Sequence, residues 1–112
     1  MADLFDLTGR VALITGGARG LGAAAGEALA ESGATVCLAD LDADAAAATA
    51  EQLAGSTGSI VIGRGCDVRD AAAVDRLVAS VVEEFERIDV LVNNAGIHRR
   101  VDPLDYDPAD VE

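Results

Sequence analysis

The chain has 112 residues, which is enough for one domain with its own core. Apolar residues make up 51% and the mean hydropathy is +0.29, which argues against a disordered chain. The net charge is −12 and all eight basic residues are Arg, so the clustered Lys and Arg that bind nucleic acid or anionic membranes are missing.

The two cysteines, Cys37 and Cys66, are interpreted as reduced core residues, because each falls in a predicted strand. Neither belongs to a C-x-x-C pair, and with His98 as the only histidine no metal site is expected. The acidic start differs from a secretory signal, and no apolar stretch has membrane-spanning length. We therefore expect a cytoplasmic protein with no nucleic-acid or membrane partner.

Apolar runs and helical patterns alternate along the whole chain. In chain order the predicted elements are a strand at 11–14, a helix at 21–32, a strand at 35–39, a helix at 42–54, a strand from 59 to about 66, a helix from 70 to 85 and a strand at 88–92. A further helix is expected to start at Asp107-Pro108, which resemble an N-cap and a first helical position.

Helix ends and faces are predicted from capping residues and apolar spacing. Asp42 and Asp70 are placed as N-caps, and Gly33 is placed to end the first helix. Helical spacing assigns the apolar face of the first helix to Leu21, Ala24, Ala25, Ala28 and Leu29, and that of the third to Val74, Leu77, Val78, Val81, Val82 and Phe85.

The strands are continuous apolar runs, as in sheets covered on both faces. Right-handed crossovers between them give an α/β fold of the Rossmann type, a doubly wound parallel sheet in the order 3-2-1-4. We expect residues 1–112 to form a single, partial dinucleotide-binding domain that is truncated after the fourth strand.

The segment from Thr15 to Gly22, between the first strand and the first helix, has the pattern of a phosphate-binding loop. Gly16 allows a tight turn, Gly20 allows close approach of a pyrophosphate, and Gly22 allows close packing of the helix. The helix N-terminus would then present N–H groups to the phosphates. The alternative is a turn that merely closes a loop, but the flanking strand and helix favour phosphate binding.

Asp40 is placed at the end of the second strand, where a carboxylate can accept hydrogen bonds from both hydroxyls of an adenosine ribose. It would repel a 2′-phosphate, which favours NAD over NADP. The alternative is that Asp40, with Asp42 and Asp44, forms a solvated start to the next helix. Arg19 in the glycine loop could reach a 2′-phosphate, so NADP is the alternative cofactor.

Three motifs together resemble the short-chain dehydrogenase/reductase family, from about Phe5 onward. They are T-G-x-x-x-G-x-G at 15–22, the pair Asp67-Val68 after the third strand, and N-N-A-G at 93–96 after the fourth. The resemblance implies cofactor contacts from Gly16, Arg19, Gly20, Leu21, Gly22, Asp40, Leu41, Asp67, Val68, Asn93, Ala95 and Gly96.

The resemblance also implies individual roles. Asp67 would bind the adenine amino group and Val68 would pack beside the ring. The loop from Asn93 to Gly96 would lie along the nicotinamide, with Asn93 and Asn94 also tying strands together. The alternative for the two asparagines is an ordinary turn, and both interpretations hold at once in this family.

The catalytic residues of the family are not found in these 112 residues. Its chemistry uses a Ser, usually an Asn, and a Tyr followed four residues later by a Lys, but the chain contains no Lys, and Tyr106 is followed at that spacing by Asp110. An intact form would transfer hydride between a nicotinamide and a small-molecule alcohol or ketone, and would be a homo-oligomer.

Two rival interpretations remain open: a truncated or degenerate nucleotide-binding module without catalysis, and another Rossmann protein such as an epimerase or a flavin enzyme. The motif from Asn93 to Gly96 counts against the second. Because the fourth strand would form an apolar edge, the 112 residues are expected to be marginally stable or to self-associate.

The stretch from Gly96 to Leu104 is similar to that of gluconate 5-dehydrogenase-type enzymes, which suggests a sugar acid or a polyol as substrate. A 3-oxoacyl group is the alternative substrate. Arg99 and Arg100 beside His98 would then meet a substrate carboxylate. A solvated basic loop is the alternative.

Overall fold

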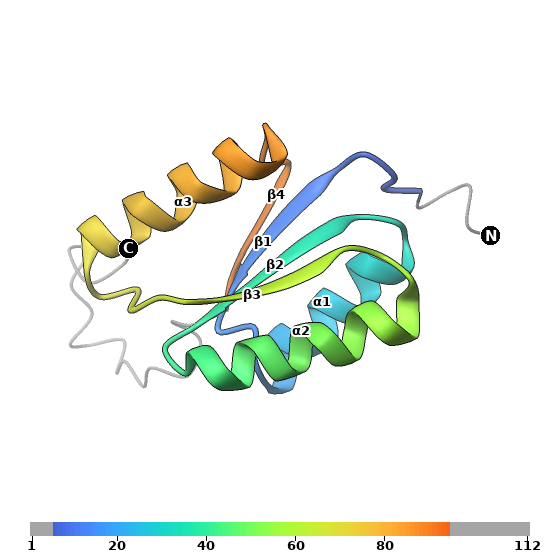
Figure 1. Ribbon diagram of the computed structural model, residues 1–112, viewed down its shortest axis with the longest axis horizontal. Helices are drawn as coiled ribbons and strands as arrows, with labels where there is room; N and C mark the ends of the chain where they lie inside the picture. Colours follow the sequence, from blue (N-terminus) through green and yellow to red (C-terminus); the bar gives the residue numbers. More distant parts are fainter. Residues whose placement is uncertain (1–5, 95–112) are drawn as a thin grey trace, which may run out of the picture.

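The computed structural model describes residues 6–94, which alternate between strand and helix (Figure 1). The elements are β1 (Val11–Thr15), α1 (Gly20–Glu31), β2 (Thr35–Asp40), α2 (Ala43–Thr57), β3 (Val61–Gly65), α3 (Ala71–Phe85) and β4 (Val90–Asn93). Every predicted strand and helix within the described residues is present. The helix expected at Asp107-Pro108 lies outside them.

The four strands form one parallel sheet in the order β3-β2-β1-β4. This is the predicted order, so the Rossmann-type α/β fold is confirmed. Thr15 is paired with Ala39 of β2 and with Asn93 of β4, and Asp40 is paired with Gly65 of β3. The register therefore brings the carboxyl ends of all four strands to one edge of the sheet.

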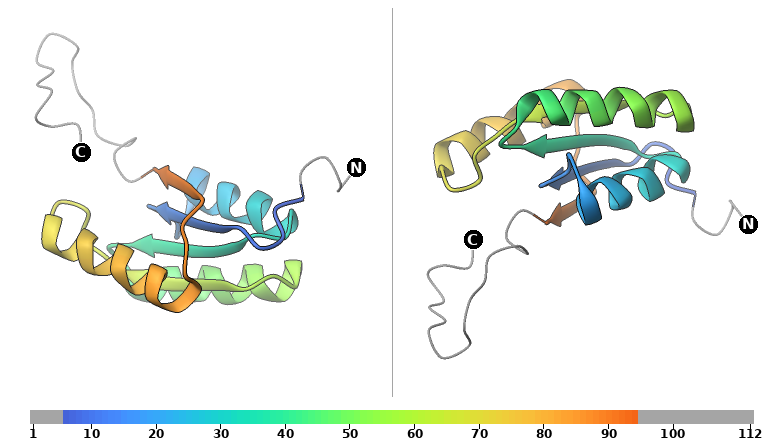
Figure 2. Two further views of the ribbon diagram at one scale, coloured as in Figure 1. Left: turned by 90° about the horizontal axis from the view of Figure 1, so that it is seen from above. Right: turned by 90° about the horizontal axis from the view of Figure 1, so that it is seen from below.

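Helices cover both faces of the sheet, with α1 and α2 on one side and α3 on the other (Figures 1 and 2). Alternate strand residues consequently point into two separate cores. The core under α1 and α2 contains Ala12, Ile14, Ala30, Ala34, Val36, Leu38, Ala50, Leu53 and Val61. The core under α3 contains Val11, Leu13, Cys37, Ala39, Cys66, Leu77 and Val81.

The predicted apolar face of α1 is only partly correct, because Ala25 and Leu29 pack against the core but are not the most buried residues of the helix. The buried residues are Gly22, Gly26 and Ala30, whereas Leu21 is 66% exposed. A Cβ on Gly26 would lie 2.8 Å from Cδ2 of Leu38, so the missing side chain lets α1 approach β2 closely. Hydropathy spacing overlooks such a face because glycine contributes no apolar side chain.

The face predicted for α3 is only partly buried. Leu77 and Val81 pack in the core, but Val78 is 37% exposed and Val82 is 42% exposed. On β4, Leu91 is 64% exposed at the edge of the described sheet. Self-association through this edge stays a prediction.

Several helix ends follow the predicted capping residues. The Asp42 carboxylate accepts a hydrogen bond from the Ala45 N–H, and the Asp70 carboxylate accepts from the first turn of α3. Gly33 follows α1 with φ +100°, a conformation that favours glycine. β3 is shorter than predicted, so Cys66 lies one residue beyond it, although it is still buried.

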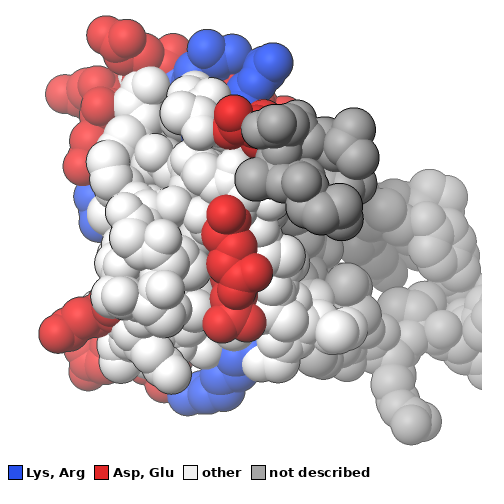
Figure 3. All heavy atoms as spheres, turned by 90° about the vertical axis from the view of Figure 1, so that its right-hand side faces the viewer, with Lys and Arg blue, Asp and Glu red and all other residues white. Residues whose placement is uncertain are grey.

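At the opposite end of the sheet, where the strands begin, Asp89 connects the start of β1 with the segment before β4. Its carboxylate accepts the Val11 N–H over 2.8 Å and pairs with Arg87 at 2.7 Å and Arg10 at 3.5 Å. Figure 3 views this end, where acidic side chains lie in several separate groups with basic groups near them.

None of the helices within residues 6–94 has the length and apolar character that a membrane span requires.

Candidate functional site

The predicted site residues come from four segments that meet at the carboxyl edge of the sheet. The glycine loop follows β1, Asp40 ends β2, Asp67 follows β3 by two residues, and Asn93 ends β4. The Cys66 N–H donates to the Asp40 carbonyl over 2.9 Å, which holds the start of the Asp67 segment against the end of β2. This edge is where open parallel sheets bind ligands.

The glycine loop depends on the absence of side chains at three positions. Gly16 and Gly20 have φ values of +66° and +57°, where a side chain is strained. A Cβ on Gly22 would collide with the carbonyl group of Gly16, whereas one on Gly20 would meet nothing within 4 Å. Gly22 therefore holds the loop against the helix, and Gly20 leaves its backbone open to a ligand.

The N-terminus of α1 differs from those of the other two helices. Arg19 occupies the N-cap position without a side-chain cap hydrogen bond, and the first turn carries no acidic residue. By contrast, aspartates cap α2 and α3. The first N–H groups of a helix have no partner within it, so the start of α1 is suited to an anionic group.

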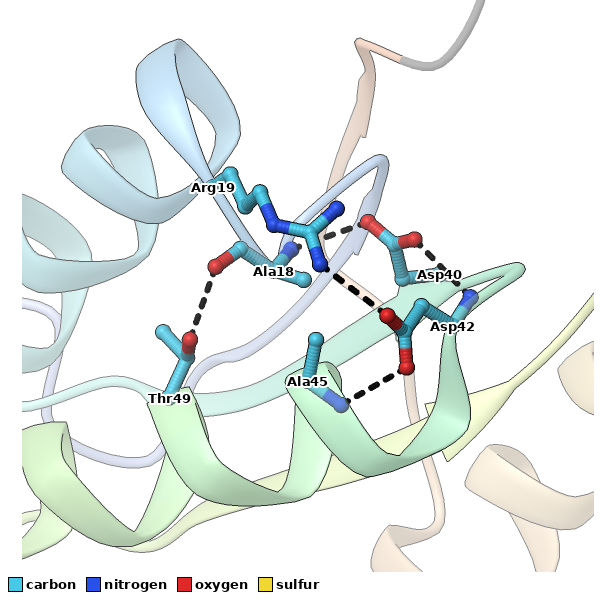
Figure 4. Close-up of polar contacts among 6 residues, drawn as sticks. All are labelled: Ala18, Arg19, Asp40, Asp42, Ala45 and Thr49. Atoms are coloured by element: carbon cyan, nitrogen blue, oxygen red, sulfur yellow. Dashed lines mark hydrogen bonds and ion pairs between the residues drawn. The ribbon is translucent and has the colours of Figure 1, made fainter.

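Asp40 lies beside the loop, with both carboxylate oxygens engaged (Figure 4). Oδ2 accepts a hydrogen bond of 3.1 Å from the Ala18 N–H, and Oδ1 accepts one of 3.1 Å from the Asp42 N–H. A carboxylate offers about four acceptor sites, so each oxygen keeps one for a further donor. Asp40 is only half-buried, which leaves those sites accessible.

Ala18 joins the loop to the second βα unit, a role that sequence analysis did not assign to it. Besides the bond to Asp40, its carbonyl accepts a 2.7 Å hydrogen bond from the Thr49 hydroxyl of α2. The neighbouring Gly17 N–H donates to the Ala39 carbonyl over 3.1 Å. These bonds fix the loop relative to Asp40, and no sequence motif indicates them.

Arg19 and Asp42 form an ion pair, with NH2 of Arg19 3.0 Å from Oδ2 of Asp42 (Figure 4). The hydrogen bond from the Ala45 N–H lowers the pKa of Asp42, and Arg19 lowers it further. The two side chains are 72% and 47% exposed. The sequence predicts Asp42 only as a helix cap, and no motif connects it with Arg19.

Asp67 is held by a residue that sequence analysis did not single out. Its Oδ1 accepts 3.0 Å bonds from the N–H and Nε of Arg69, and its Oδ2 accepts a 3.1 Å bond from NH2. The side-chain hydrogen bond from Arg69 lowers the pKa of Asp67. Val68 beside it is half-buried. The D-x-R spacing of Asp67 and Arg69 is the one feature of the sequence that could have indicated this contact.

Asn93, which ends β4, and Asn94, which follows it, both contact the carboxyl end of β1. Oδ1 of Asn93 accepts a 2.9 Å bond from the Thr15 hydroxyl, and the Asn94 amide donates to the Gly16 carbonyl over 3.1 Å. Asn94 is 2% exposed, so its amide is part of the fold.

The remaining predicted residues are either exposed or outside the described part of the chain. Leu21 and Leu41 are 66% and 68% exposed. Ala95 and Gly96 lie outside residues 6–94, as do the candidate substrate residues at 98–100 and Tyr106.

The comparisons with known proteins all indicate the same family. The short chain dehydrogenase family model matches residues 10–112. D-threitol dehydrogenase of Mycolicibacterium smegmatis is 50% identical over 95 residues, covering 85% of this chain and 36% of that protein. Sorbitol dehydrogenase of Cereibacter sphaeroides is 44% identical, covering 81% and 34%. The chain thus spans about a third of the length of these relatives.

Solved structures agree with the sequence relatives. A short-chain type dehydrogenase/reductase from Mycobacterium marinum superposes with a TM-score of 0.80 at 38% identity, covering 94% of this chain and 42% of that one. The Pseudomonas aeruginosa RhlG/NADP active-site complex gives 0.78 at 40% identity, covering 86% and 38%. With the sheet order and the glycine loop described above, these matches show that the chain belongs to the short-chain dehydrogenase family.

Proposed function

We propose that the chain is the dinucleotide-binding part of an NAD(P)-dependent oxidoreductase, and that NAD is the favoured cofactor. The observation that supports this proposal most directly is the position of the Asp40 carboxylate, which the Ala18 N–H holds beside the glycine loop. Each of its oxygens has a site that can accept a further hydrogen bond. Those sites suit the two hydroxyls of an adenosine ribose, and the charge disfavours a 2′-phosphate. RhlG, a structural relative, forms a complex with NADP, so the choice of cofactor needs a direct test.

The other cofactor contacts follow from the same edge of the sheet. The start of α1 and Gly20 would receive the diphosphate, and Asp67 and Val68 would meet the adenine. Asn93, Ala95 and Gly96 would lie along the nicotinamide. When bound, the nicotinamide would accept a hydride from an alcohol in its oxidised form or donate one to a ketone in its reduced form, while these residues bind and orient the dinucleotide.

We further propose a polyol or related hydroxyl compound as the substrate class of the intact enzyme. The support comes from relatives named D-threitol dehydrogenase, sorbitol dehydrogenase and galactitol 2-dehydrogenase, which are 43–50% identical over the matched residues. Because the 112 residues contain no Lys, we expect this chain to bind the dinucleotide without oxidising such a substrate.

Isothermal titration calorimetry of the chain with NAD, NADP and FAD tests this proposal. We expect NAD to bind, and Asp40→Ala to weaken NAD by about tenfold or more, because hydrogen bonds to a charged acceptor are lost. The relative affinity for NADP should rise. Asp44→Ala, which removes the same charge from an exposed position on α2, should leave NAD binding within about twofold.

Two results would contradict the proposal. Binding of FAD with no response to NAD would assign the site to a flavin. Equal NAD affinity in wild type and Asp40→Ala would remove Asp40 from the ribose site.

A further inference from the structure

We infer that Asp42 is a specificity-determining residue for the dinucleotide, because it holds the guanidinium of Arg19 in an ion pair and so withholds it from a 2′-phosphate. This inference rests on the proposed dinucleotide binding and goes beyond it, since Asp40 and Arg19 were given a part in the choice between NAD and NADP and Asp42 was not. Asp42 is not expected to touch NAD. It would act only through Arg19, as a positioning residue.

The geometry on which this depends is a chain of contacts at the end of β2 (Figure 4). Oδ2 of Asp40 accepts the Ala18 N–H, and the next residue, Arg19, reaches across to Oδ2 of Asp42 at 3.0 Å. The Asp42 N–H in turn donates to Oδ1 of Asp40. The Arg19 guanidinium therefore lies next to the Asp40 carboxylate, which is proposed to bind the ribose. Asp42 already neutralises the charge of this guanidinium.

Charge decides what this cation can do. A 2′-phosphate would remove one of the ribose hydroxyls that could donate a hydrogen bond to Asp40, and it would need a cation to offset repulsion from that carboxylate. Arg19 is suited to this role because its guanidinium can bind phosphate in a bidentate manner. To do so it must exchange Asp42 for the phosphate, so the ion pair opposes binding of NADP and has no such effect on NAD.

The two functions of Asp42 are carried by different oxygens, which makes the idea testable. Oδ1 caps α2 by accepting the Ala45 N–H over 3.0 Å, and Oδ2 holds Arg19. Asn and Ser are N-cap residues comparable to Asp. Asp42→Asn and Asp42→Ser therefore keep the helix cap while removing the charge that holds the guanidinium.

Asp44 provides the matched control, because it is exposed in the first turn of the same helix. Asp44→Asn removes one negative charge from the same region but leaves the Arg19–Asp42 pair intact. It measures how much NADP gains merely from a less acidic surface. Arg19→Gln and the double variant Arg19→Gln/Asp42→Asn complete a double-mutant cycle.

The experiment is calorimetric titration of NAD and NADP into the full 112-residue chain and these variants. We expect Asp42→Asn and Asp42→Ser to improve the affinity for NADP relative to NAD by about two- to fivefold more than Asp44→Asn does, the range that an exposed ion pair permits. In the Arg19→Gln background, Asp42→Asn should give no such gain.

The inference is overturned if Asp42→Asn and Asp44→Asn shift the NADP-to-NAD ratio equally, or if the gain persists without Arg19. It is also overturned if every variant binds NAD but none binds NADP. Each of these three results would leave the proposed dinucleotide binding intact. If the wild-type chain binds neither dinucleotide, the proposed function fails together with this inference.

Discussion

The side-chain amide of Asn94 donates a hydrogen bond to the carbonyl oxygen of Gly16 over 3.1 Å, joining residues 78 positions apart. The Asn94 N–H also donates to the Thr15 carbonyl. The amide nitrogen lies within 2.9 Å of where a Cβ of Gly22 would be. The glycine loop is therefore shaped by the end of β4 as well as by its own glycines.

Replacing Asn94 with Ala should destabilise the fold by about 1–3 kcal/mol, because the Gly16 carbonyl loses its side-chain donor and a buried side chain is removed. Urea denaturation measures this free energy of unfolding. Gln52→Ala, which removes an exposed amide from α2, should change it by less than about 0.5 kcal/mol. Equal effects of the two substitutions would show that the Asn94 contact contributes nothing.

Gly22→Ala should be strongly destabilising, since the added Cβ would collide with the Gly16 carbonyl and no flexible side chain can yield. Overpacking of this kind costs about 1–3 kcal/mol. Gly55→Ala in α2 is the control, because its Cβ would meet nothing within 4 Å. It should stabilise the helix by roughly 0.5–1 kcal/mol. Thermal melts that rank the two variants in the opposite order would contradict the described loop geometry.

The fold was predictable from sequence because each strand lies at a run of apolar residues, and because the glycine loop or a capping aspartate marks the start of each helix. The Asp42 and Asp70 caps and the order β3-β2-β1-β4 were all predicted correctly. The fully buried residues of α1 were not predicted, because Gly22, Gly26 and Ala30 pack through close backbone approach, which hydropathy does not register.

Only the site residues that belong to sequence motifs were predictable. The glycine loop, Asp40, Asp67 and Asn93 are found at one edge of the sheet because parallel strands place their carboxyl ends together. The residues that fix them gave weaker signals. Ala18 acts through its backbone, and the partners of Arg19 and Asp67 depend on side-chain directions that spacing alone does not define.

Acid should weaken the fold partly through Asp89. The side-chain hydrogen bond from Arg87, and then the Val11 N–H, lower the pKa of this carboxyl below its usual value. The ionised form therefore stabilises the folded chain above the ordinary pKa of about 3.9, and this contribution is lost as the pH falls through the lower folded-state value.

Asp89→Asn should accordingly reduce the free energy of unfolding at pH 7, and the difference from wild type should shrink toward pH 3. Urea denaturation at several pH values measures both. Asp75→Asn, which removes the same charge from the exposed surface of α3, serves as the control. A difference for Asp89→Asn that stays constant from pH 7 to pH 3 would contradict the ion-pair explanation.

The thiols should be unreactive in the folded chain. Burial raises the pKa of Cys37 to about 11, and it also raises the pKa of Cys66. Since the thiolate is the reactive form, both should modify slowly with an aromatic disulfide reagent at neutral pH and quickly in denaturant. Cys66, which is 8% exposed, should react before Cys37, which is 0% exposed. Fast labelling of Cys37 in the native chain would mean that β2 opens readily.

The central claim is that the glycine loop and Asp40 together hold the adenosine half of a dinucleotide. A crystal structure of the chain with NAD tests it most directly. We predict diphosphate oxygens within hydrogen-bond distance of the N–H groups at the start of α1, and both ribose hydroxyls on the Asp40 carboxylate. A dinucleotide bound elsewhere, or one that leaves Asp40 in contact only with Ala18 and Asp42, would contradict the claim.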